Sequence, residues 1–330
     1  MHDLSGPHFL RLPALELLPM PLSMPTQTPS SDPTLQGAPL CAAPDPAPRA
    51  PALTVPTGGC DCHAHICGPA DQYAYSPDRI YTPPDALLPA YRSMLSMLNL
   101  TRGVLVQPSV YGSDNTVLMA ALQAGGDAFR GVAVIDDTMD ADALQAMHAA
   151  GVRGVRVNIV DRKTGKGELP MDEVRALADR IAPLGWHLEL LMHVDAFPDL
   201  ATSLGDLPVQ LVFGHLGYMA PGARVDTPAF QGLLELMARG RAWVKLTGPY
   251  RISTGSMPYP DVQPLAEALL RAAPDRVVWG SDWPHVMVKR DMPNDGDLLD
   301  LLQTWAPDAA LRRRVLVDNP SALYDFPPLP

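Results

Sequence analysis

The sequence predicts a (β/α)8 barrel, the TIM-barrel fold class, preceded by a proline-rich N-terminal arm. Two observations support the barrel. Short runs rich in valine, leucine and isoleucine alternate with longer segments in which apolar residues have helical spacing. The short runs do not alternate strictly between apolar and polar residues, which is typical of strands buried on both faces of a parallel sheet. Eight such strands, alternating with helices over about 270 residues, match a barrel.

The expected strands begin after the Gly58-Gly59 break and recur to near the end of the chain. In order, they are Cys60–His63, Gly103–Gln107, Gly131–Ile135, Gly154–Asn158, Leu188–His193, Val209–His215, Trp243–Thr247 and Val277–Asp282. An open doubly wound sheet is the alternative. That fold usually has a glycine-rich phosphate loop after its first strand, where this chain has His63-Ala64-His65.

Amphipathic helices are expected between these strands, because apolar residues there recur every three or four positions. The segments are Asp85–Leu98, Asn115–Ala124, Asp140–Ala149, Met171–Leu184, Pro228–Arg239, Val262–Ala272 and Asp297–Trp305. In a barrel, such helices form the outer layer that covers the sheet.

Residues 1–57 differ from the rest in composition. They hold 13 of the 37 prolines and show no sustained apolar periodicity. Proline removes a backbone donor and excludes a long helix or a central strand. We therefore expect a mostly disordered or extended arm over residues 1–57 and the barrel over residues 58–330. The apolar stretch 9–22 is interrupted by charges and prolines, so it is not expected to be a signal peptide.

The charge and hydropathy of the chain exclude several classes of partner. The formal net charge is −11, and the 25 basic residues form no long run. Neither a nucleic acid nor a membrane is therefore an expected partner. No apolar run approaches the length of about 18 residues that a transmembrane helix needs. A small anionic substrate is compatible with this charge, because a cleft can be locally positive. A homo-oligomer is left open.

Four cysteines are too few for a disulfide scaffold at this length, which predicts a reduced, cytoplasmic protein. Three of them, Cys60, Cys62 and Cys67, flank a pair of histidines. A structural zinc cluster formed by these three thiols is an alternative to a set of small buried side chains.

The segment Asp61-Cys62-His63-Ala64-His65 is the most informative motif. Side chains alternate between the two faces of a strand. Asp61, His63 and His65 are therefore expected on one face. Cys60 and Cys62 are expected on the other face, towards the covering helices. Two imidazoles on one face can bind one divalent metal or contact one substrate. The other interpretation is a surface turn that happens to hold two histidines.

Other polar residues follow the remaining strands at their C-terminal ends, where the active site of a barrel forms. They include Gln107, Ser109, Arg156, Asn158, Arg162, His193, His215, Tyr250, Arg251 and Asp282. His285 follows Pro284 in the loop after Asp282 and is a further candidate for contact with the substrate. Four histidines and an aspartate at one edge of a predicted barrel favour an active site over chance.

Several separated motifs in the chain occur together in one known family. They are Asp61–Pro69, Tyr75–Pro83, Gly151–Asn158, Gly185–His187, Trp279–His285 and Asp318–Pro320. The set resembles the amidohydrolase superfamily, in the amidohydrolase-related (amidohydrolase 2) branch that contains 2-pyrone-4,6-dicarboxylate lactonase and related lactone hydrolases. The resemblance covers residues 58–326, which is nearly all of the chain outside the arm.

The resemblance implies roles for individual residues. Asp282 is expected to be the proton-shuttling carboxylate that activates water, and the other catalytic residues are expected to be His63, His65 and His215. The substrate is expected to contact Tyr81, Ser109, Arg156, Arg162 and Arg251. Guanidinium groups bind carboxylates bidentately, so these arginines suit an anionic lactone.

The resemblance also bears on the cofactor. The pyrone lactonase has a tyrosine and a glutamate near the end of strand five, where this chain has Leu191 and His193. Losing the tyrosine argues against the dicarboxylated pyrone itself, and gaining a histidine adds a metal-ligand type. One divalent metal, zinc or manganese, is expected to be bound by His63, His65, His193, His215 and Asp282. Catalysis without a metal stays open, as in the pyrone lactonase.

The function expected from the sequence is therefore a hydrolase that opens a carboxylated lactone. Substrates similar to 2-pyrone-4,6-dicarboxylate, muconolactone or a sugar-acid lactone are compatible, which places the protein in aromatic or sugar-acid catabolism. One alternative is a metal-dependent, non-oxidative decarboxylase on a related barrel. Another is a small-molecule-binding barrel without turnover, and the intact Asp282 argues against it.

Overall fold

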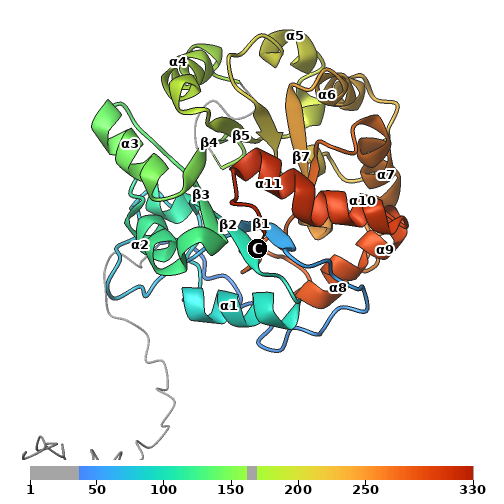
Figure 1. Ribbon diagram of the computed structural model, residues 1–330, viewed down its shortest axis with the longest axis horizontal. Helices are drawn as coiled ribbons and strands as arrows, with labels where there is room; N and C mark the ends of the chain where they lie inside the picture. Colours follow the sequence, from blue (N-terminus) through green and yellow to red (C-terminus); the bar gives the residue numbers. More distant parts are fainter. Residues whose placement is uncertain (1–36, 162–168, 330) are drawn as a thin grey trace, which may run out of the picture.

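The computed structural model describes residues 37–161 and 169–329. Eight parallel strands form one sheet in the order β1 to β8 (Figure 1). They are β1 Cys60–Ala64, β2 Arg102–Val106, β3 Phe129–Ala133, β4 Val152–Asn158, β5 His187–Leu191, β6 Leu211–Phe213, β7 Ala242–Leu246 and β8 Val277–Trp279. A parallel bridge between Ala64 and Trp283 joins the segment after β8 to β1. The predicted (β/α)8 barrel is therefore confirmed.

Helices cover the outside of the barrel. They are α1 Leu88–Met97, α2 Thr116–Gly125, α3 Ala141–Ala149, α4 Met171–Ile181, α5 Leu200–Leu204, α6 Pro228–Ala238, α7 Gln263–Ala272, α8 Asp295–Asp300, α9 Leu302–Trp305, α10 Ala309–Arg313 and α11 Asn319–Tyr324. The sequence did not predict α5, because five residues are too few to show a helical period. The last expected helix, Asp297–Trp305, is two shorter helices that meet at Leu301.

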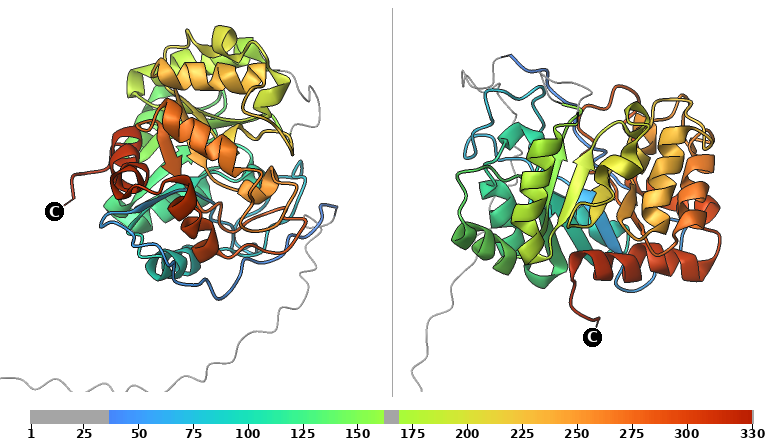
Figure 2. Two further views of the ribbon diagram at one scale, coloured as in Figure 1. Left: turned by 90° about the vertical axis from the view of Figure 1, so that its right-hand side faces the viewer. Right: turned by 90° about the horizontal axis from the view of Figure 1, so that it is seen from above.

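Two apolar clusters lie on the two sides of the sheet. The larger one lies between the sheet and the outer helices. The smaller one fills the inside of the barrel and includes Val104, Val132 and Val278. Tyr324 and Phe326 belong to this inner cluster, and α10 and α11 lie across the N-terminal ends of the strands (Figure 2). This end of the barrel is therefore closed by packing, which leaves the C-terminal ends of the strands for the site.

The first strand differs from the simple alternation expected for it. Cys60 and Cys62 lie inside the barrel, whereas Asp61 faces the helix layer, where the Tyr91 hydroxyl donates to its carboxylate at 3.0 Å. The pairing of β1 with β2 changes register between Asp61 and Ala64, which is a β-bulge. Because of this bulge, His63 also turns into the barrel, although it is separated from Asp61 by one residue.

Residues 37–57, the second part of the expected arm, pack on the barrel in an extended conformation. The backbone amides of Ala52 and Leu53 donate to the carboxylate of Asp300 at 2.9 and 2.8 Å. The Arg49 amide donates to the Asn294 side chain at 3.0 Å. Proline-rich chains have fewer backbone N–H donors. Here the remaining backbone N–H groups donate hydrogen bonds to side chains in the α8 region. Residues 1–36 lie outside the described residues.

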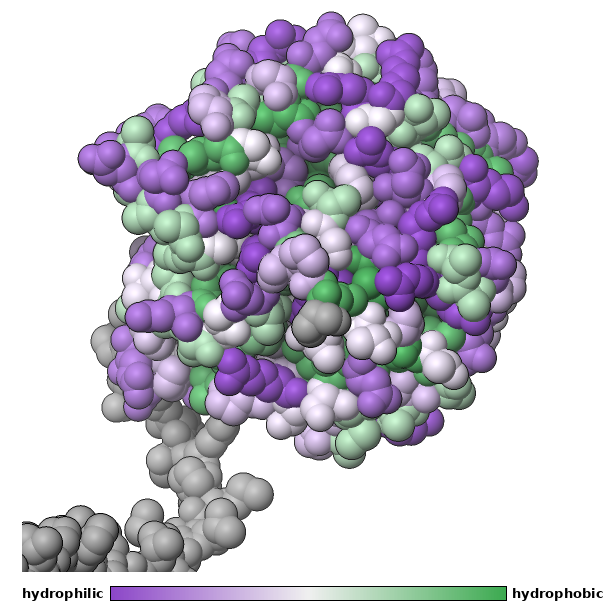
Figure 3. All heavy atoms as spheres, viewed as in Figure 1, coloured by the Kyte–Doolittle hydropathy of each residue, from purple (hydrophilic) through white to green (hydrophobic). Residues whose placement is uncertain are grey.

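The face that carries α11 is largely polar at the surface. Figure 3 shows hydrophilic residues over most of this face, with apolar residues scattered between them. Scattered exposed apolar residues are normal for a folded domain and do not by themselves mark an interface. Within the two described ranges, every helix is too short or too polar to traverse a bilayer.

Candidate active site

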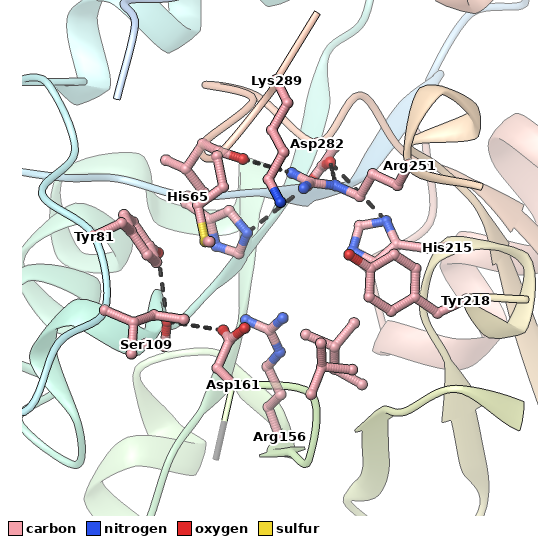
Figure 4. A pocket seen from close by; sticks show the side chains of 15 residues that line it. His65, Tyr81, Ser109, Arg156, Asp161, His215, Tyr218, Arg251, Asp282 and Lys289 are labelled. Carbon is pink, nitrogen blue, oxygen red and sulfur yellow. Dashed lines mark hydrogen bonds and ion pairs between the residues drawn. The ribbon is translucent and has the colours of Figure 1, made fainter. Parts of the chain in front are cut away.

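A pocket of about 280 Å³ opens at the C-terminal ends of the strands. Figure 4 shows His65, His215, Arg251 and Asp282 on one side of it and Arg156 on the other. The wall between them includes apolar side chains such as Leu191. The barrel topology places these residues together, since each one follows or ends a different strand.

The two carboxylate oxygens of Asp282 have different surroundings. Oδ2 accepts hydrogen bonds from the Tyr250 hydroxyl and from Arg251 Nε, each at 2.6 Å. Oδ1 instead faces His63 Nε2 at 3.7 Å and His65 Nε2 at 3.9 Å. Burial opposes ionisation, but the Arg251 guanidinium and the nearby imidazoles outweigh it and hold the pKa of Asp282 below its usual range. Asp282 is therefore a carboxylate with one occupied and one available oxygen.

The backbone of Asp282 is held in a conformation that favours glycine. Its φ is 72°, a conformation that costs a non-glycine residue on the order of 1–3 kcal/mol and persists only where surrounding contacts impose it. The Asp282 amide donates to the His63 carbonyl at 2.8 Å, and the preceding Ser281 amide donates to Asp61 at 2.8 Å. Gly248 leaves room for the side chain, since a Cβ there would lie 3.0 Å from Asp282 Oδ2. These contacts keep the carboxylate aimed into the pocket.

Three neutral imidazoles lie around the Asp282 carboxylate, His63 and His65 near Oδ1 and His215 near Oδ2. His65 Nδ1 donates to the Val106 carbonyl at 2.8 Å, which leaves a lone pair on Nε2, the atom that faces Asp282. Burial lowers the pKa of His65 to about 4 and that of His215 to about 3. Burial, followed by the Lys245 ammonium, also holds the pKa of His63 well below its usual range. Neutral imidazoles can act as metal ligands or as hydrogen-bond partners of a substrate.

The donor set around Asp282 fits a divalent cation. His63, His65 and Asp282 each offer one ligand atom, and these atoms lie within 4.8 Å of one another. His63 Nε2 is buried and has no hydrogen-bond partner within the described ranges, as expected of an atom with a role other than structure. Two imidazole nitrogens and a carboxylate oxygen are common zinc ligands. Among the described residues this is the one such group, and Cys60, Cys62 and Cys67 are not part of it.

A buried ion pair lies directly against His63. Lys245 Nζ of β7 is 2.5 Å from Glu189 Oε2 of β5, and both side chains have at most 1% exposure. The same ammonium is 3.2 Å from His63 Nδ1, and Glu189 Oε1 is 3.5 Å from that nitrogen. Lys245 and Glu189 therefore form a buried ion pair on the barrel side of His63.

His285 lies behind Asp282, away from the pocket. Its Nδ1 is 2.9 Å from the Tyr250 hydroxyl, and its Nε2 is 3.0 Å from Asp295 Oδ1. The ring is fully buried, and it does not line the pocket. The geometry therefore does not support the expected contact of His285 with substrate. It supports a chain from Asp295 through His285 to Tyr250, which orients the hydroxyl that binds Asp282.

His193 is separated from the other candidate ligands. Its ring is exposed and stacks on Tyr218 with 4.6 Å between ring centroids, and its Nδ1 is 2.8 Å from the Tyr218 carbonyl. Strand β5 ends at Leu191, two residues earlier than expected, so His193 starts the following turn. His193 therefore does not lie with His63, His65 and Asp282. His215 lies beside Asp282 but outside the three-residue donor group. Arg162 lies outside the described residues.

The remaining expected binding residues line the pocket. Arg156 is 7% exposed, and its Nη1 reaches the Gln107 carbonyl at 3.4 Å. Its Nε is buried and has no partner among residues 37–161 and 169–329. Ser109 Oγ lies 3.5 Å from the Tyr81 hydroxyl. A buried cation with unsatisfied donors is costly, so Arg156 is suited to an anion in the pocket.

Some pocket residues were not predicted from the sequence. Lys289, Asp161 and Tyr218 line the cavity. Each of them lies in a loop that follows a strand, which is the position from which barrel enzymes draw their site residues. A search of whole loops, as opposed to strand ends, could have found them. Nothing local marks Glu189 as a neighbour of His63.

Comparisons with known proteins agree with this geometry. A sequence model of the amidohydrolase family matches residues 60–326. The chain is 39% identical over 301 residues to the 4-sulfomuconolactone hydrolase of Hydrogenophaga intermedia, covering 89% of this chain and 97% of that protein. It is 37% identical over 286 residues to a 2-pyrone-4,6-dicarboxylate hydrolase of Comamonas testosteroni, covering 84% and 93%. A crystal structure of an Agrobacterium tumefaciens protein in its apo form matches with a TM-score of 0.77 at 31% identity, covering 85% of this chain and 100% of that one.

Proposed function

Because the chain belongs to the amidohydrolase family, we propose that it is an enzyme that hydrolyses a carboxylated lactone with water activated by Asp282. The observation that carries the proposal is the asymmetry of Asp282, whose Oδ2 is saturated by two donors while Oδ1 faces the pocket histidines. The hydrolases of anionic lactones among its relatives support the substrate class.

The proposed reaction uses Asp282 twice. Oδ1 accepts a proton from water as the water oxygen bonds to the lactone carbonyl carbon. The ring C–O bond then breaks, and Asp282 returns the proton to the departing ring oxygen. The net reaction adds one water to the lactone and yields an open-chain hydroxy acid. Tyr250 and Arg251 keep Oδ2 occupied throughout, so that the proton moves at Oδ1.

A divalent cation such as zinc or manganese would be held by His63, His65 and Asp282. When bound, such an ion lowers the pKa of its water and polarises a carbonyl. The side chains around this position also have roles that do not depend on the ion. The Val106 carbonyl keeps the His65 lone pair on Nε2, and His215 lines the pocket next to Asp282. The same arrangement also permits Asp282 to activate water without an ion.

Cationic side chains define the part of the pocket that binds the substrate carboxylate. Arg156 lines the pocket with an Nε that has no partner among the described residues, and Lys289 lines the same cavity. Tyr81 and Ser109 add hydroxyls on the adjacent wall. Arg251 is less available, because its Nε binds Asp282 and its Nη2 donates to the Val286 carbonyl at 3.0 Å. We therefore assign carboxylate recognition first to Arg156.

The test is to assay the purified protein with a panel of lactones that differ in the presence of a ring carboxylate. Hydrolysis at neutral pH releases one proton per lactone, which an indicator dye records, and NMR identifies the hydroxy acid. Carboxylated lactones are expected to react with at least about tenfold higher kcat/KM, the low end for a charged hydrogen bond.

The other outcomes separate the alternative functions. Release of carbon dioxide with loss of one carbon would identify the decarboxylase. Conversion of the lactone to an isomer of the same composition, without proton release, would identify an isomerase. Tight binding of a carboxylated lactone without any product would identify a binding protein. Equal rates with neutral lactones would refute the proposed substrate class.

A further inference from the structure

The ion pair between Lys245 and Glu189 lies in an unusual place for a charged pair. It is inside the barrel, where the paired positions on the neighbouring strands hold Val212 and Val278. Burying two charges costs several kcal/mol per ion, and replacing such pairs by apolar residues is often neutral or stabilising. The stability of the barrel therefore does not by itself account for the pair. Its contact with His63 is the feature that needs explanation.

The two charged groups favour different tautomers of His63. An ammonium has donors only, so the 3.2 Å contact from Lys245 Nζ to His63 Nδ1 requires a lone pair on Nδ1. The proton of the neutral ring is then on Nε2. A carboxylate accepts only, so the 3.5 Å approach of Glu189 Oε1 would favour the opposite tautomer, with the proton on Nδ1.

Only one of these tautomers can bind a cation through the nitrogen that faces Asp282. His63 Nε2 is 3.7 Å from Asp282 Oδ1 and would need a lone pair to act as a ligand. Histidine ligands usually donate their other N–H to a carboxylate or a carbonyl, which is the arrangement that Glu189 could provide. The shorter contact, however, is the one with Lys245.

We propose that Lys245 is a positioning residue that holds His63 with its proton on Nε2 and thereby weakens cation binding at His63, His65 and Asp282. For a cation to use the Nε2 lone pair, the ring proton must move from Nε2 to Nδ1, and the Nδ1–H would then donate a hydrogen bond to Glu189. The pair thus sets how readily the site takes up a cation. This inference rests on the cation site of the proposed function, and it makes no assumption about the substrate.

The experiment measures cation affinity in the full-length protein without any lactone. Lys245→Met removes the charge and keeps a side chain of similar length. Each protein is stripped with a chelator and titrated with Co²⁺ in competition with a chromophoric chelator. Lys245→Met is expected to bind Co²⁺ at least about tenfold more tightly than the unmodified protein, the low end of the effect of a second contact on metal affinity. Arg271→Met, which removes an exposed charge on α7, should leave the affinity unchanged.

A second readout reports the tautomer directly. Ring ¹⁵N spectra of histidine-labelled, cation-free protein should show His63 with its proton on Nε2, and Lys245→Met should move that proton to Nδ1. A folded Lys245→Met protein with Co²⁺ affinity within about twofold of the unmodified protein would overturn the proposal. So would an unmodified protein that already carries the Nδ1 proton.

Lys245→Met leaves Glu189 without its cation, and the single variant could fail to fold. In that case the double variant Lys245→Met/Glu189→Gln decides, because it has no orphaned charge and keeps an acceptor oxygen near Nδ1. Tighter Co²⁺ binding by the double variant supports the proposal, and unchanged binding refutes it. Lactone turnover is measured separately, so failure of the proposed lactonase function would not be confused with failure of this inference.

Discussion

Arg156 offers the sharpest test of how the pocket recognises a substrate. Replacing it with methionine keeps the length of the side chain and removes the charge. If Arg156 binds a substrate carboxylate equally in the ground and transition states, KM rises and kcat is unchanged. A hydrogen bond to a charged group contributes about 1.5–3 kcal/mol, which corresponds to an increase in KM of about 10- to 150-fold.

The same substitution should stabilise the free protein. Arg156 is 7% exposed, and its Nε has no partner in the described part of the chain. A buried polar group without a partner costs roughly 1–3 kcal/mol, so Arg156→Met should raise the free energy of unfolding by a similar amount. A gain in stability combined with a loss of substrate affinity is the signature expected of a binding residue.

The assay combines steady-state kinetics on a carboxylated lactone with denaturant unfolding. Arg102→Met is the matched control, because Arg102 is also buried but donates to the Gly58 carbonyl and to the Ser321 hydroxyl. That variant should lose stability and keep its KM. An Arg156→Met protein that is less stable and has a KM within about twofold of the unmodified protein would show that Arg156 has a structural role.

Three further residues and one segment can be tested in the same way. Asp282→Asn should keep the fold and lower kcat at least about a hundredfold, and unchanged kcat would remove the mechanism. Tyr250→Phe should lower kcat by about tenfold or more with little change in KM, because Asp282 Oδ2 loses one of its donors. Burial, followed by the Lys245 charge, lowers the pKa of His187 to about 3, below its unfolded value of 6.5. Its contribution to stability is therefore present above pH 6.5 and falls by about 3 kcal/mol by pH 4, and denaturant unfolding of His187→Leu should show a smaller fall. Deleting residues 1–57 should lower the melting temperature, because Leu53 is buried; an unchanged value would mean that this packing does not stabilise the barrel.

The sequence by itself determined the fold class and the edge of the barrel that carries the site. All eight strands were predicted close to their observed positions, because buried parallel strands have an apolar composition that is visible locally. The motif around His63 and His65 and the position of Asp282 after the last strand identified the central residues. Both signals depend on only a few neighbouring residues and need no knowledge of the tertiary structure.

The tertiary structure decided which candidates meet. His193 and His285 have the right residue type near the right strands, yet one stacks on Tyr218 at the surface and the other lies behind Tyr250. His193 lies outside the site because β5 ends at Leu191, two residues before it. His285 has a positive φ of 61°, and its side chain points away from the pocket. Both depend on backbone geometry that sequence patterns do not encode.

Contacts across the barrel were equally beyond the sequence. Lys245 and Glu189 reach His63 because β1, β5 and β7 all direct side chains into one closed interior. The bulge in β1 directs His63 there, although simple alternation placed Asp61 on the same face. Local periodicity determines which segments become strands, whereas the register and closure of the sheet determine which side chains share the space inside. For this protein, local sequence patterns determine the fold and point to His63, His65 and Asp282. The register and closure of the sheet determine the hydrogen bonds around these residues.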